Sequence, residues 1–291
     1  MNLPEQGNIE DPAFSPDGRR IAMRFVDVGE SQDIWIFDRD QGTLERLTDE
    51  GTVNATPVWT PEGTRIAFSS VRDGEPSQLY WQPSDGSGSA ERLLTTDFRT
   101  MPSSWSPDGQ TLAFAGLRDG SWDVGLLTPG DSTPRWILES EFNEFHPQLS
   151  PDGLWLAYTS DRSGEQEVYV EAASGEGRRA PVSIDGAHSP RWAPDGDVLY
   201  YVGEVGVFGT IIAATVSTDG GFRVTSHTEQ FDVFDLNHLG VGGGTGIMSV
   251  NYDVHPEGEE LVHIRIEGEG GRTLIWILNW PEIVREMTSV R

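Results

Sequence analysis

A five-residue phrase, repeated six times, constrains the fold of this chain more than any other feature of its sequence. Each copy has an aromatic or aliphatic residue, then Ser, Thr, Ala or His, then Pro, then Asp or Glu, and then Gly. The lead residues are Phe14, Trp59, Trp105, Leu149, Trp192 and Val254, at intervals of 45, 46, 44, 43 and 62 residues. A period of about 44 residues is typical of the four-stranded blades of a β-propeller. Six copies therefore predict six blades.

The phrase predicts a tight turn between two strands. Pro sets φ for the second position of a type I turn, Asp or Glu is tolerated at the third, and Gly takes the left-handed conformation that follows. Apolar residues come after each turn in a strand-like pattern, as in Arg65-Ile66-Ala67-Phe68. We expect the lead residue of each copy to pack between blades rather than to bind a ligand.

The repeats run almost from end to end, which predicts one closed domain. The blades are expected at about residues 11–53, 54–98, 99–143, 144–186, 187–230 and 231–291. Residues 1–10 are expected to lie along the last blade and close the ring, because closure removes exposed strand edges. A glycine-rich stretch within 231–250 predicts a flexible loop, and Pro281 predicts a short C-terminal helix. The predicted fold is an all-β, six-bladed propeller of four-stranded antiparallel blades.

The charge of the chain argues against nucleic acid as a partner. There are 20 Lys and Arg residues against 47 Asp and Glu residues, a formal net charge of −27, whereas nucleic-acid binding depends on basic side chains that neutralise phosphates. No stretch approaches the roughly 20 apolar residues of a membrane helix, so we expect no membrane insertion by this chain. With no cysteine, neither disulfides nor thiol chemistry contribute. A monomer is expected.

The repeated phrase resembles the PD40 (TolB-like, WD40-like) propeller family, whose hallmark is Pro-x-Phe/Trp-Ser-Pro-Asp-Gly followed by an Ile-Ala pair. Further stretches, at 33–38, 142–144, 158–164 and 278–283, resemble the propellers on the C-terminal side of bacterial serine/threonine protein kinases. This resemblance implies a sensor or protein-interaction domain, excised from a larger bacterial protein, periplasmic or extracellular, with no catalytic residues of its own. The kinase motifs themselves do not occur in the sequence.

Candidate binding residues are expected at one mouth of the central channel. Strand parity places the loops before each first strand and the loops between second and third strands on the same rim. These loops supply Asp11, Arg72, Arg99, Arg118, His146, His188 and Asn251. His146 and His188 come from neighbouring blades and are expected to face one funnel, where they permit a metal ion or an acid–base pair. A polar mouth with ordered water is the alternative interpretation.

Two functions are compatible with these residues. The first is a non-catalytic recognition module that binds a protein or a small ligand at the channel mouth, with no cofactor. The alternative is a metal-dependent propeller enzyme, of lyase or hydrolase type, that acts on acidic sugars through His146, His188 and Arg99. The hydrolase motif G-x-S-x-G and the metalloprotease motif H-E-x-x-H do not occur, which favours the first function. A scaffold without a ligand is a third possibility.

Overall fold

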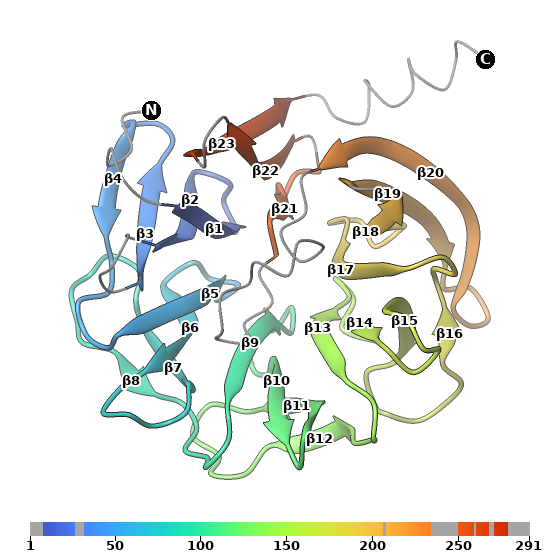
Figure 1. Cartoon of the computed structure of the whole chain (residues 1–291), viewed down its shortest axis with the longest axis horizontal. Helices are drawn as coiled ribbons and strands as arrows, with labels where there is room; N and C mark the ends of the chain where they lie inside the picture. Colours follow the sequence, from blue (N-terminus) through green and yellow to red (C-terminus); the bar gives the residue numbers. More distant parts are fainter. Residues whose placement is uncertain are drawn as a thin grey trace.

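The computed structural model describes residues 8–26, 32–205, 208–233, 250–258, 260–267 and 271–278. Within these ranges every regular element is a β-strand, and the strands form five sheets. The sheets stand radially around a central axis, like the blades of a propeller (Figure 1). Part of the predicted fold, an all-β propeller of antiparallel sheets, is therefore confirmed.

The first sheet has eight strands: β1 Asn8–Phe14, β2 Arg20–Val26, β3 Gln32–Asp38, β4 Thr43–Arg46, β5 Val53–Trp59, β6 Arg65–Val71, β7 Gln78–Pro83 and β8 Glu91–Arg92. It consists of two antiparallel groups, β1–β4 and β5–β8, joined through one parallel bridge between Gln32 and Val53. This bridge lies where the outer part of one group meets the innermost strand of the next.

Three four-stranded antiparallel sheets follow: β9 Thr100–Trp105, β10 Leu112–Arg118, β11 Ser121–Leu127 and β12 Arg135–Leu138; then β13 Glu144–Leu149, β14 Trp155–Ser160, β15 Glu167–Ala172 and β16 Ala180–Pro181; then β17 Ala187–Trp192, β18 Val198–Val205, β19 Phe208–Ser217 and β20 Arg223–Val233. The described part of the last sheet has β21 Tyr252–Val254, β22 Glu260–Glu267 and β23 Gly271–Leu278. Strands β1, β5, β9, β13, β17 and β21 lie nearest the axis (Figure 1).

The repeated phrase forms the turn between the first and second strands of each group, as predicted. In the first copy the Gly18 amide donates to Ser15 O at 2.8 Å. The Ser15 hydroxyl accepts from the Arg20 amide at 2.9 Å and donates to Asp17 Oδ1 at 2.5 Å. The closing glycines of the six copies have φ between 68° and 77°, a conformation that glycine adopts without steric cost.

The six turns also contact one another in a cycle. A Cβ on Gly63 would lie 3.5 Å from Pro16 of the preceding turn, and a Cβ on Gly18 would overlap the His255 imidazole of the last turn. In the other four turns the closing glycine also lies against a residue of the preceding turn. The pairs are Gly109 with Glu62, Gly153 with Pro107, Gly196 with Pro151 and Gly258 with Pro194. The last turn thus contacts the first, and the ring of turns is closed.

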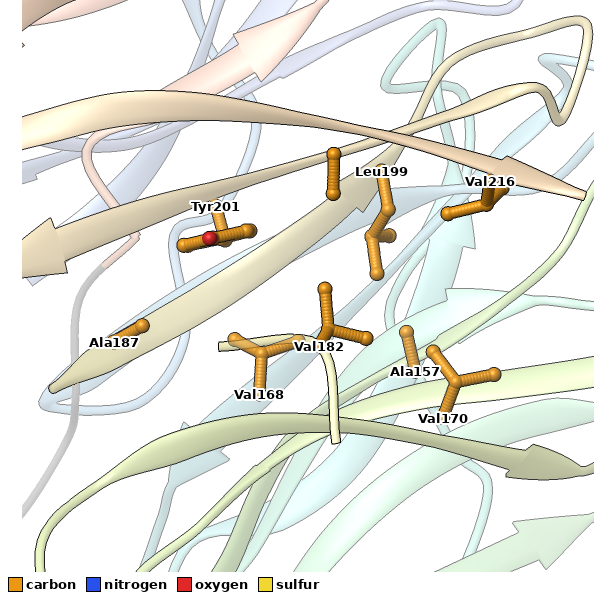
Figure 2. Packing of buried hydrophobic residues seen from close by; sticks show 9 residues of the cluster. Ala157, Val168, Val170, Val182, Ala187, Leu199, Tyr201 and Val216 are labelled. Carbon is orange, nitrogen blue, oxygen red and sulfur yellow. The ribbon is translucent and has the colours of Figure 1, made fainter. Parts of the chain in front are cut away.

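The hydrophobic core lies between neighbouring sheets. Figure 2 shows one such layer, in which side chains of β14 and β15 face side chains of β18 and β19; its labelled members are Ala157, Val168, Val170, Val182, Ala187, Leu199, Tyr201 and Val216. The lead residues of the phrase belong to these layers, as expected: Trp59 Nε1 donates to Ala13 O at 3.0 Å, and Trp192 Nε1 donates to Gln148 O at 3.1 Å.

The first and last sheets meet through packing and hydrogen bonds. Ile9 of β1 packs in one cluster with Val262 and Ile264 of β22, and the Phe14 amide donates to Asp253 Oδ2 at 2.8 Å. Residues 8–10, predicted to lie along the last blade, instead belong to β1 and pair with β2. Strand β1 includes Asn8, which lies before the predicted start of the first blade at about residue 11, so this innermost strand is longer than the sequence suggested.

Three other predictions concern segments outside the described residues. Residues 1–7, the glycine-rich stretch at 234–249 and the predicted helix after Leu278 lie outside them. Strand β20 continues to Val233, past the predicted end of the fifth blade at residue 230. Its length reflects an extended pairing with β19, which runs from Ser217–Arg223 to Gly209–Val233.

Candidate functional site

A cavity of about 280 Å³ lies between the innermost strands. Its wall includes residues of β1, β5, β9, β13, β17 and β21, so it occupies the central axis of the ring. The turn residues Ser15, Pro16, Pro61 and Pro256 also line it. The cavity therefore reaches the face that carries the repeated turns, which is opposite to the rim predicted from strand parity.

The innermost strands carry a β-bulge just before a proline. Asp11, Thr56, His146 and Ser189 lie at these bulges with φ between 49° and 56°. Left-handed backbone is uncommon for residues other than glycine, costs on the order of 1–3 kcal/mol, and is often found at functional sites. Three of the four, namely Asp11, Thr56 and His146, line the cavity.

Of the seven residues predicted for the site, Asp11 and His146 line the cavity. The other five do not belong to its wall: Arg72, Arg99, Arg118, His188 and Asn251. Asp11, His146 and His188 also lie within strands β1, β13 and β17 rather than in the loops before them. The sequence predicted that each first strand starts after these residues. In the structure the innermost strands start earlier and continue through the bulge, so the residues belong to the strands.

The two arginines from the second-to-third-strand turns lie away from the cavity. Arg72 forms an ion pair with Glu50, and its guanidinium carbon is 4.0 Å from the centre of the Tyr80 ring. Arg118 pairs with Glu139 at 2.6 Å and stacks 4.3 Å from a ring centre of Trp136. Both side chains therefore bind partners that do not line the cavity: Arg72 joins the segment after β4 to β7, and Arg118 contacts residues in and directly after β12. This agrees with local structural roles rather than with a ligand site.

His146 and His188 do not form the expected pair in the cavity wall. His146 occupies a bulge before Pro147, and the residue in the same place before Pro190 is Ser189 rather than His188. His188 is buried, and its Nδ1 lies 2.8 Å from Ser189 Oγ. Across the described ranges, no group of three or more His, Asp or Glu side chains is arranged to hold a metal ion.

Asp11 connects neighbouring sheets. Its Oδ1 accepts from the Val250 amide at 3.1 Å, its Oδ2 accepts from the Thr56 amide at 3.3 Å, and Arg24 Nε lies 3.3 Å from Oδ2. These contacts join β1 to β5 and to the segment that enters β21. Asp11 is therefore a buried carboxylate that holds the ring together.

Two charged residues of the wall, Arg191 and Asp253, were missed in the sequence. Arg191 Nη1 donates to Pro190 O at 3.1 Å, and its Nε lies 3.6 Å from Asp253 Oδ1. Burial raises the pKa of Asp253, and the nearby Arg191 opposes this shift. Since Asp253 also accepts from the Phe14 amide, it links the last sheet to the first.

A positional rule in the sequence identifies both residues. Each comes directly before the lead residue of a phrase, and all six residues at that position line the cavity: Ala13, Val58, Ser104, Gln148, Arg191 and Asp253. In chain order the set runs from apolar through polar to charged. At this position the first two strand groups therefore contribute apolar side chains to the wall, and the last two contribute charged ones.

The family follows from a match over most of the chain. The PD40 family, described as the TolB beta propeller domain, matches residues 4–104 and 87–232. The chain belongs to this family. The TolB-like resemblance of the repeated phrase is thereby confirmed, and the further resemblance to kinase-attached propellers remains a prediction.

Two relatives of this TolB-type propeller match over short stretches of sequence. The chain is 32% identical over 84 residues to "Uncharacterized peptidase YuxL" of Bacillus subtilis. The matched stretch is 27% of this chain and 13% of that protein. The chain is 36% identical over 67 residues to "Tol-Pal system protein TolB" of Alcanivorax borkumensis, 23% of this chain and 15% of that protein. The matched stretches thus span less than a sixth of these relatives.

Solved structures share the fold of this TolB-type propeller over nearly its whole length. Putative TolB from Agrobacterium tumefaciens superposes with a TM-score of 0.68 at 22% identity, over 93% of this chain and 91% of that one. An oligogalacturonate lyase in complex with manganese gives 0.62 at 14% identity, over 94% and 89%. At these identities the similarity shows the fold alone. Among the described residues, no helix is long and apolar enough to cross a membrane.

Proposed function

We propose that this TolB-type propeller is a non-catalytic recognition domain that binds a protein segment or a small ligand in its central cavity. The observation that carries this proposal is the cavity of about 280 Å³, whose wall combines apolar side chains with the charged pair Arg191 and Asp253. Concave sites with mostly apolar walls and a few placed polar groups are typical of ligand binding.

The contacts of the two cavity carboxylates favour recognition over catalysis. Asp11 and Asp253 each accept a backbone amide from a neighbouring part of the ring. Both oxygens of Asp11 and one oxygen of Asp253 are engaged in these contacts, which join neighbouring strand groups. A structural role of this kind favours recognition over a general base or a metal ligand, which must bind the substrate or the ion as well.

We also propose the finer architecture and setting of the domain. Six blades agree with the six turns that contact one another in a closed cycle. The motifs shared with kinase-attached propellers favour a monomeric sensor domain of a larger bacterial protein, with the propeller in the periplasm or outside the cell.

A cavity-filling variant tests the proposal. Ala13→Phe narrows the cavity at its apolar wall, whereas Leu154→Phe changes a residue that is 65% exposed and does not line it. We expect compounds or peptides that raise the melting temperature of the wild type to lose this effect in Ala13→Phe and to keep it in Leu154→Phe. Ligands that stabilise all three proteins equally would contradict a site in the cavity.

The alternative function is a metal-dependent enzyme acting on acidic sugars. It is favoured by His146 in the cavity wall and by the shared fold with the lyase crystallised with manganese. Incubation with oligogalacturonate and Mn²⁺ discriminates between the two functions. The recognition proposal expects no unsaturated product; turnover that is lost in His146→Ala would instead establish the enzyme.

A further inference from the structure

Arg191 has hydrogen-bonding capacity that its neighbours do not use. The guanidinium carries five N–H donors in a planar fork. The structure gives it one hydrogen bond, to Pro190 O, and the 3.6 Å ion pair with Asp253. The side chain lines the cavity and is 17% exposed. Several donors of this fork therefore have no protein partner among the described residues, on a side chain that lines the cavity.

An arginine fork selects one chemical class above others. Carboxylates accept two parallel N–H bonds from guanidinium, and such charge-assisted pairs are stronger and more directional than neutral hydrogen bonds. Asp253 does not fill this role, since its Oδ2 is bound to the Phe14 amide and its Oδ1 is 3.6 Å away. The open position beside Arg191 thus fits a carboxylate brought by a ligand.

The apolar part of the cavity wall specifies what should be attached to that carboxylate. Ala13 and Val58 occupy the same position before the lead residue as Arg191 does, and Phe14 and Trp59 extend this apolar wall. A volume of about 280 Å³ is at the small end of ligand pockets, which run from roughly 300 to 1,000 Å³. The cavity therefore has room for one or two residue-sized groups.

The surface around the cavity indicates how this group is presented. Every turn of the ring carries an exposed acidic residue in its repeated phrase, namely Asp17, Glu62, Asp108, Asp152, Asp195 and Glu257. Arg19 adds an exposed positive charge on the same face, whereas Arg20 and Arg39 are bound to Gly63 O and Glu260. A free apolar anion would approach this acidic rim unfavourably, and a basic polypeptide would be attracted to it.

We infer that the cavity binds the C-terminus of a partner polypeptide, with the terminal carboxylate on Arg191, an apolar last side chain against Ala13 and Val58, and preceding basic residues over the acidic turns. This inference rests on the proposed recognition function and names the class of its ligand. The unused guanidinium donors of Arg191 support the carboxylate, the apolar part of the wall supports the last side chain, and the acidic turns support the basic residues.

Binding of matched tetrapeptides tests the inference. The probe is N-acetyl-Lys-Lys-Ala-Leu with a free carboxylate, compared with its C-terminal amide by calorimetry on the full chain. We expect the amide to bind about tenfold or more weakly, the scale of a lost charge-assisted hydrogen bond. In Arg191→Gln the two peptides should bind alike, whereas Arg135→Gln, an exposed arginine on β12, should keep the preference.

The outcomes separate this inference from the proposed function. Equal binding of acid and amide to the wild type, with both lost in Ala13→Phe, would overturn the carboxylate site and leave recognition in the cavity intact. A preference for the acid that persists in Arg191→Gln would overturn the role of Arg191. If Arg191→Gln does not fold, Arg191→Lys serves, and a preference weakened several-fold supports the planar fork.

Two further probes test the polypeptide occupant. N-acetyl-Glu-Glu-Ala-Leu should bind more weakly than the basic peptide, with the difference shrinking at high salt because rim charges are screened. N-acetylleucine supplies the same carboxylate and side chain without a peptide. Binding of N-acetylleucine as tight as that of the basic tetrapeptide would overturn the polypeptide assignment in favour of a small apolar acid.

Discussion

Glu171 of β15 is a buried carboxyl with an unusual titration. Burial and the nearby Glu144 carboxylate raise its pKa to about 7, whereas the Tyr158 hydroxyl and Arg179 Nε, each 3.4 Å from Glu171 Oε2, act in the opposite direction. Because the ordinary value is 4.5, the folded state holds this proton more tightly than the unfolded state does. Its contribution to stability is therefore full below about pH 4.5 and is lost as the pH rises through 7.

Glu171→Gln should remove this pH dependence. The neutral amide carries no buried charge at either pH. We therefore expect the difference in free energy of unfolding, variant minus wild type, to be larger at pH 8.5 than at pH 5 by on the order of 2 kcal/mol. Urea unfolding at the two pH values measures the difference. Glu176→Gln, on an exposed residue of the following loop, is the control and should behave as the wild type at both.

Trp59 and Trp105 are equivalent lead residues that differ in one hydrogen bond. Trp59 Nε1 donates to Ala13 O, whereas Trp105 Nε1 is buried and has no hydrogen-bond partner. Replacement by Phe removes the N–H in both cases. We expect Trp59→Phe to cost about 1 kcal/mol more than Trp105→Phe, the net contribution of one hydrogen bond. Chemical denaturation compares them, and equal losses would contradict the assignment.

At the scale of elements, the closing glycine of a turn has two separate roles. Gly18 needs its positive φ and also leaves room for His255 of the last turn, whereas Gly74 has positive φ and open space around it. We expect Gly18→Ala to lower the melting temperature well beyond Gly74→Ala, which carries only the backbone strain of about 1–2 kcal/mol.

Gly63→Ala completes this comparison. Its new methyl group would meet Pro16 at an ordinary 3.5 Å, so its cost should match that of Gly74→Ala. Similar melting temperatures for all three variants would show that the turn-to-turn contact at His255 does not support the ring.

The turns were predictable from the sequence, and the channel was not. Pro, Asp and Gly act on their own backbone, so Pro16-Asp17-Gly18 reveals its conformation locally. The bulges at Asp11 and His146 arise from pairing with a second strand and from contacts with other sheets. A one-residue shift in a strand exchanges the two faces, which explains why His188 was wrongly placed beside His146.

Another repeated contact was invisible in the sequence. A polar side chain near the start of each third strand bonds the segment after the fourth strand in four successive groups: Asp33 with Thr48, Gln78 with Thr96, Asp123 with Ser140 and Glu167 with Ser183. The residue types differ because the contact requires only an acceptor and a donor. Because the contact has the same place in each group but uses different residue types, it leaves no recognisable sequence motif.

At the scale of the whole molecule, excess negative charge opposes the compact state. The formal net charge is −27, and self-repulsion of this kind is screened when the Debye length falls from about 30 Å at 0.01 M salt to about 3 Å at 1 M. We expect NaCl to raise the melting temperature by several degrees, with most of the rise below a few tenths molar. Calorimetry measures this, and a melting temperature that falls with salt would contradict it.

The overall architecture was accessible because each repeat forms its own group of antiparallel strands. The spacing of the phrase predicted radial antiparallel sheets, and the family and the strand pairing confirm a TolB-type propeller. The cavity required the assembled ring, since every innermost strand contributes residues to its wall. Arg191 and Asp253 are 62 residues apart in the chain and meet only when the last sheets are in place.

The contact between successive turns has a direction, because the glycine of one turn always receives a residue of the turn before it. Each repeat therefore carries both halves of the same joint. Duplication or loss of a whole repeat during evolution would leave every remaining joint with a matching partner. The number of repeats in such a ring can change by genetic events that create no new interface.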